Sequence, residues 1–129
     1  SYGNAIMLSD SEKEIMTKVS QMITDPERIK KTDPGHPEIC NVFDFHKIYS
    51  TPQEVAEIEQ ACRKGEIGCV ACKKQMGVNL AARLAPIRER REYYANNLKL
   101  VEEIMVTGSD KARAEAEATM VLVRDAIKI

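Results

Sequence analysis

Four cysteines are the residues of this 129-residue chain whose type and spacing point most directly to chemistry. They are Cys40, Cys62, Cys69 and Cys72, in the pattern C-x21-C-x6-C-x2-C. Cys69 and Cys72 are three residues apart and can present two sulfur atoms from one helical turn to one metal centre. In the reducing cytosol, where we expect this chain, disulfides are rare. We therefore predict a metal site with all four cysteines as ligands; the alternative is that they are small apolar core residues.

Four thiolates can hold either a zinc ion or a [4Fe-4S] cluster. Structural zinc sites commonly use two Cys-x-x-Cys pairs, whereas this chain has one pair and two separated cysteines, which favours the cluster. Cys69 and Cys72 fall in the first turn of a helix that we expect to open at Gly68, where unpaired N–H groups stabilise negative charge. Four cations close in sequence are expected to offset that charge: Arg63, Lys64, Lys73 and Lys74.

The formal charge of −1 hides a basic stretch. Residues 61–92 contain eight basic and three acidic residues, so this window carries +5 and the rest of the chain −6. A local basic surface can bind phosphate groups even on an acidic protein, because each charge acts over only about 10 Å in salt. A solvated helix face is the alternative interpretation.

Capping patterns and apolar periodicity predict an all-α fold, a helical bundle of about six helices. Ser9 to Glu12 matches a Ser-x-x-Glu capping box, and Thr51-Pro52 followed by Glu54 is a second start signal. Pro86 is expected to kink the fourth helix. Residues 24–37 read as an extended loop. The expected helices span 11–23, 38–49, 51–65, 68–94, 98–108 and 112–127.

The composition is that of a globular protein, with 43% hydrophobic and 30% charged residues. No apolar run approaches the roughly 20 residues of a membrane helix, and Ser1 to Asn4 do not resemble a signal peptide. We expect a cytoplasmic chain with one modest core, cut from a longer protein. His36 and His46 read as surface or core histidines instead of ligands, and no spacing indicates a Ser/His/Asp or Cys/His catalytic set.

Several short segments match a known family in the order in which they occur. SYGNAI at 1–6 resembles the end of the KMSKS segment of class I aminoacyl-tRNA synthetases. The other segments are TDP at 24–26, DPG at 33–35, PEICN at 37–41, CRKG at 62–65 with IGC at 67–69, LAPIRERR at 84–91 and GSDKAR at 108–113. Together they resemble bacterial tryptophanyl-tRNA synthetases over essentially the whole chain.

This resemblance implies that residues 1–10 are the end of the KMSKS loop with a linker, and 11–129 a helical anticodon-binding domain. The family activates tryptophan with ATP and transfers it to tRNA(Trp), and its longer chains are expected to form homodimers. Ser1 would be the last residue of the ATP-binding motif. We expect this chain alone to be inactive, because the nucleotide-binding domain and its HIGH motif are missing.

Some members of the family carry a [4Fe-4S] cluster on a similar cysteine pattern near the anticodon, which implies the same ligand role for the four cysteines here. Many members lack these cysteines, so the cluster is expected to shape the RNA-reading surface instead of taking part in aminoacylation. The expected tRNA contacts are Lys73, Lys74, Arg88, Arg90 and Arg91. The alternative function is a zinc-stabilised helical interaction domain without nucleic-acid binding.

Overall fold

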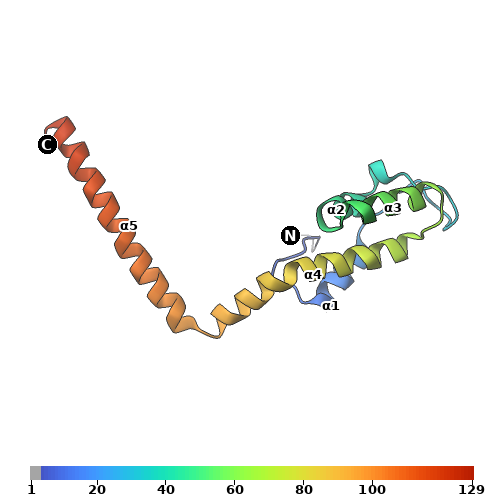
Figure 1. The fold of residues 1–129 in the computed structure, drawn as a ribbon, viewed down its shortest axis with the longest axis horizontal. Coiled ribbons are helices and arrows are strands. Elements are labelled where there is room, and N and C mark those ends of the chain that lie inside the picture. Colours follow the sequence, from blue (N-terminus) through green and yellow to red (C-terminus); the bar gives the residue numbers. More distant parts are fainter. Residues whose placement is uncertain (1–3) are drawn as a thin grey trace. The chain divides into compact units, whose positions relative to one another are not determined.

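The computed structural model describes residues 4–129, and this range contains helices and no strands, which confirms the all-α prediction. The elements are α1 Glu12–Gln21, the 3-10 helix η1 Pro37–Ile39, α2 Asn41–Tyr49, α3 Pro52–Arg63, α4 Cys69–Ala95 and α5 Leu98–Ile127 (Figure 1). The chain divides into two compact units, one ending at Glu89 and one over Arg90–Ile129.

The first helix begins with a capping box, but in a different frame from the predicted one. The side chain of Ser11 accepts from the backbone N–H of Glu14 at 3.3 Å, and the Glu14 carboxylate accepts from the N–H of Ser11 at 2.8 Å. The Ser9–Glu12 assignment is therefore wrong. Both frames satisfy the sequence pattern, and the later one directly precedes the buried Ile15.

The predicted second helix is interrupted at its start. η1 is followed by Cys40 in an extended conformation, with φ −102° and ψ 110°, and α2 begins only after it. The third helix is confirmed: Thr51 and Glu54 form a reciprocal capping box, and a proline occupies its first position. Gly65 follows with φ +71°, a backbone conformation that favours glycine.

The long α4 carries the core of the first unit. Met76, Leu80 and Leu84 are buried along one side, as the periodicity predicts, and the helix continues through Pro86. At Gly77 the helix lies directly against α1, because a Cβ there would be 2.6 Å from the sulfur of Met16. The other helices contribute five residues to the same core: Ile15, Val19, Val42, Phe43 and Ile58.

The second unit contains the last turns of α4 and the whole of α5. The two helices predicted for 98–108 and 112–127 are one continuous helix of 30 residues, so the described chain has five α-helices instead of six. Gly108 does not end it: an interior glycine costs only about 1 kcal/mol, and alanine-rich sequence follows. α5 has no buried residue. No helix within residues 4–129 is both long and apolar enough to span a bilayer.

Candidate metal centre

The four cysteines come from three separate segments of the first unit. Cys40 lies between η1 and α2, Cys62 in the last turn of α3, and Cys69 and Cys72 in the first turn of α4. All four are free thiols; Cys40 and Cys72 are buried, and the other two are half-buried. The predicted start of α4 after Gly68 is confirmed, since the N–H of Cys72 donates to the Gly68 carbonyl at 3.0 Å.

The thiols are close enough for their charges to act on one another. Burial, with smaller contributions from negative charge at Cys40, Cys62 and Cys69, raises the pKa of Cys72 to about 12. Burial likewise raises the pKa of Cys62, with contributions from Cys40 and Cys69. Within residues 4–129, no three Cys, His, Asp or Glu side chains are already arranged to hold a single metal ion.

Arg28 is the cation that lies against two of the sulfur atoms, and it was not predicted from the sequence. Its Nη1 is 3.9 Å from the Sγ of Cys62 and 3.9 Å from the Sγ of Cys69. Its Nη2 donates to the carbonyl of Lys31, and its buried Nε has no partner. No carboxylate of the described chain forms an ion pair with it. Arg28 lies in an irregular loop, where apolar periodicity carries no information.

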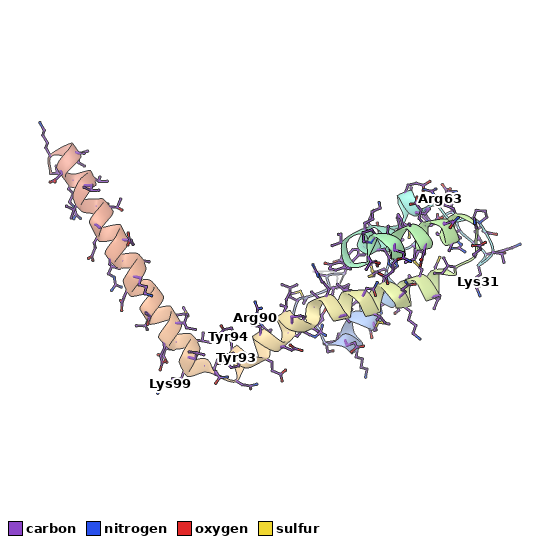
Figure 2. The ribbon with its side chains drawn as sticks, viewed as in Figure 1. Lys31, Arg63, Arg90, Tyr93, Tyr94 and Lys99 are labelled. Carbon is purple, nitrogen blue, oxygen red and sulfur yellow. The ribbon has the colours of Figure 1, made fainter. Side chains whose placement is uncertain are left out.

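The predicted counter-cation Arg63 is engaged elsewhere. Its guanidinium pairs with Glu38 at 3.0 Å and with Glu59 at 2.8 Å, at the surface of the first unit (Figure 2). Lys73 donates instead to the backbone carbonyl of Ser20 at 2.9 Å, which links α4 to α1. Carboxylates therefore take up the charge of Arg63, and Arg28 is the cation nearest to two of the sulfurs.

Gly35 fits closely against one of the candidate ligands. Its N–H donates to the carbonyl of Cys62 at 2.9 Å, and a Cβ at this position would be only 2.5 Å from the Sγ of Cys62. The neighbouring Asp25 accepts from the N–H groups of Glu27 and His36, both at 2.8 Å, and the His36 ring lies 3.0 Å from it. These contacts hold the loop against the end of α3.

His46 is a buried, hydrogen-bonded core residue, as predicted. Its Nε2 lies 3.2 Å from the carbonyl oxygen of Cys72 and its Nδ1 lies 2.7 Å from the Ser50 hydroxyl. A carbonyl can only accept, so Nε2 carries the hydrogen and Nδ1 accepts from Ser50. Burial lowers the pKa of His46, which favours this neutral form. Asn79 donates to Ser50 at 3.0 Å, so the network fixes the backbone at Cys72.

The expected tRNA-contacting cations occupy different surroundings. Arg88 folds back to donate to the Ala81 carbonyl at 3.1 Å. Arg90, labelled in Figure 2, and Arg91 are exposed in the second unit. Neither forms an ion pair within the described range. Ser1 lies outside the described residues.

Lys74 lines a surface groove of about 660 Å³ in the first unit, together with loop residues that the sequence did not single out. Lys30 and Lys31 add positive charge to this groove, and Ile29 and Val70 leave 89% and 83% of their surfaces exposed. Arg28 and Cys69 line the same groove, so it adjoins the candidate metal centre.

Two exposed tyrosines in the second unit were also not singled out by the sequence analysis. The rings of Tyr93 and Tyr94 lie edge to face with centroids 5.3 Å apart, and Figure 2 shows them near Arg90. Exposed aromatic rings beside cations are typical of surfaces on which nucleic-acid bases stack. Their adjacency in the sequence was the available signal.

Comparison with known proteins gives a consistent result. The family model of the class I tRNA synthetases for tryptophan and tyrosine matches residues 1–85. The tryptophan–tRNA ligase of Aquifex aeolicus is 45% identical over the whole chain, which corresponds to 33% of that protein. The tryptophan–tRNA ligase of Thermotoga maritima is 38% identical, again over the whole chain and over 40% of that protein.

Solved structures agree with these relatives. Tryptophanyl-tRNA synthetase from Campylobacter jejuni superposes with a TM-score of 0.84 at 26% identity, over 99% of this chain and 41% of that one. A second structure of the same protein, complexed with ADP and tryptophan, matches equally well. The chain thus spans about a third to two fifths of the length of these proteins. It belongs to the family of class I tRNA synthetases for tryptophan and tyrosine.

Proposed function

We propose that this chain is the helical, anticodon-binding part of a cytoplasmic, homodimeric tryptophan–tRNA ligase. The observation that carries the proposal is the similarity to named ligases along all of its residues. The enzyme would activate tryptophan with ATP and transfer it to tRNA(Trp). Apart from Ser1 at the end of the ATP-binding motif, the residues that bind ATP and tryptophan and catalyse the reaction would lie outside these 129 residues. This chain would supply binding energy that orients the tRNA.

We further propose that Cys40, Cys62, Cys69 and Cys72 hold a [4Fe-4S] cluster. The donor set fits: four thiols lie within Coulombic range, and a guanidinium that forms no ion pair with a described carboxylate lies beside two of them. This chain has one Cys-x-x-Cys pair and two separated cysteines, whereas structural zinc sites commonly use two such pairs, which favours the cluster over a zinc ion. When bound, the cluster would supply iron–sulfur bonds that join three chain segments.

Metal analysis of anaerobically purified or reconstituted chain tests the cluster. We expect about four irons and four sulfides per chain, with a broad visible absorption band. Replacement of Cys69 by serine should abolish the band, because it removes one of four ligands. One zinc per chain with no sulfide would refute the cluster and support a zinc-stabilised domain.

RNA binding is tested separately in a complete ligase that contains this segment. Lys74→Ala should weaken tRNA affinity several-fold and reduce the salt slope by about 0.7 to 0.9, because it removes one phosphate contact. Tryptophan-dependent ATP–pyrophosphate exchange should be unchanged. Lys13→Ala, which removes an exposed lysine from α1, is the matched control. Equal effects of the two substitutions on tRNA affinity would refute the contact of Lys74 with tRNA. A complete wild-type ligase that does not bind tRNA would refute the proposed function.

A further inference from the structure

We infer that Arg28 is the counter-cation of the four-cysteine centre. It donates N–H groups to the sulfurs of Cys62 and Cys69, stabilises them as ligands and makes a bound cluster easier to reduce. This role rests on the proposed metal centre. Arg28 acts through the cysteines and is therefore a positioning residue.

The surroundings of Arg28 leave the sulfurs, which are thiolates when a metal is bound, as its anionic partners. A guanidinium stays charged in proteins, and a partly buried charge needs a counter-charge. Arg28 makes no ion pair with a carboxylate of residues 4–129, and its Nη2 is already satisfied by a neutral carbonyl. Nη1 lies at the same 3.9 Å from two thiols. Arg63, next to Cys62 in the sequence, shows the opposite arrangement, because two carboxylates neutralise it.

This placement has a consequence for any cluster held there. Positive charge and hydrogen bonds at cluster sulfurs favour the reduced, more negative state and so raise the reduction potential. The same contacts lower the charge repulsion among four thiolates, which slows loss of the metal. Both effects need the positive charge of Arg28, and the two-donor geometry needs its planar guanidinium.

Arg28 also connects the centre to the neighbouring groove. Its Nη2 holds the carbonyl of Lys31, so the loop that carries Lys30 and Lys31 is fixed by the same side chain that contacts the sulfurs. The shape of the groove therefore depends on the guanidinium remaining at Cys62 and Cys69.

Three variants of the reconstituted chain test the inference. Arg28→Gln keeps hydrogen-bonding capacity and removes the charge, Arg28→Lys restores a charge, and Arg63→Gln is the matched control. The midpoint potential is measured at an electrode that supplies one electron per cluster, and stability by the rate of iron loss to a chelator. For Arg28→Gln we expect a more negative potential and iron loss about tenfold faster, the lower end of the effect of removing a partner of a metal ligand.

Arg28→Lys should recover part of both losses, and Arg63→Gln should match the wild type. Circular dichroism separates a folded variant without cluster from an unfolded one. If Arg28→Gln fails to fold, the comparison of Arg28→Lys with the wild type decides the question. If both variants fold, a lysine variant as defective as the glutamine variant overturns the role of charge. If the wild type binds a cluster and Arg28→Gln leaves its midpoint potential unchanged, the role of Arg28 is refuted and the metal centre is not. A wild-type chain that takes up no iron would refute the metal centre and this role together.

Discussion

Replacing Gly35 with alanine tests whether the loop and the centre are packed as one unit. The new methyl group would lie 2.5 Å from the Sγ of Cys62, 3.3 Å from its carbonyl oxygen and 3.5 Å from the Cδ of Arg28. The first distance is far below van der Waals contact, and the second leaves the backbone little room to shift. The substitution therefore overpacks the site and moves the sulfur.

The loss in free energy of unfolding caused by Gly35→Ala depends on whether a metal is bound. Overpacking a well-packed site costs about 1–3 kcal/mol. In the metal-free chain the Cys62 thiol can rotate away, so we expect about 1 kcal/mol from urea unfolding. In the loaded chain the sulfur is held by the metal and cannot rotate without breaking a ligand bond. There we expect a loss nearer 3 kcal/mol, or release of the metal.

Urea unfolding with and without metal, together with iron content, measures both states. Gly108→Ala is the matched control, because nothing lies within 4 Å of its Cβ position and it is inside a helix. It should stabilise the chain by about 0.5–1 kcal/mol. A Gly35→Ala variant with wild-type iron content and equal stability in both states would show that the loop does not pack on Cys62.

Three further substitutions probe the scaffold. Gly65→Ala should lower the free energy of unfolding by about 1–3 kcal/mol, because φ is +71° and a Cβ would collide with the Thr32 carbonyl; urea unfolding measures the loss. Thr51→Ala should cost about 1 kcal/mol in the same assay, because it removes the hydroxyl of the α3 capping box. Asp10 has a lowered pKa because Lys18 donates a hydrogen bond to it. Its contribution is therefore present above the unfolded pKa of about 3.9 and lost as pH falls through the lower folded value. Melting temperatures of wild type and Asp10→Asn should converge on acidification; a difference that persists at low pH would contradict this.

Helix starts that are determined by capping residues next to them in the chain could be predicted from the sequence. At α3, Pro52 at the first helical position marks Thr51 as the N-cap and Glu54 as its capping-box partner, and the helix begins there. The start of α1 was ambiguous, because Ser9 and Ser11 each have a glutamate three residues later and only packing of the following apolar residues chooses between them. Gly108 was overinterpreted, since a lone glycine ends a helix only when the chain must turn there.

The sequence leads as far as four candidate ligands, and their role as ligands stays a prediction. Cysteine spacing pointed to one centre, and helical periodicity placed Cys72 on the buried side of α4. The cation beside two of the sulfurs could not be predicted, because Arg28 lies 34 residues before Cys62 in a loop without periodicity. Proximity in sequence suggested Arg63, but its i,i+4 partner Glu59 already neutralises it.

The cysteines continue the apolar core. Cys62 follows the buried Ile58 by four residues, and Cys72 precedes the buried Met76 by four, so each sulfur extends an apolar stripe one turn toward the same end of the helices. Apolar side chains at these positions would complete the same packing. Loss of a metal would then leave the core of α1 and α4 intact. The loss of stability would fall on the loop that Arg28 and Gly35 hold against the end of α3. This loop forms one wall of the groove that Lys30, Lys31 and Lys74 line.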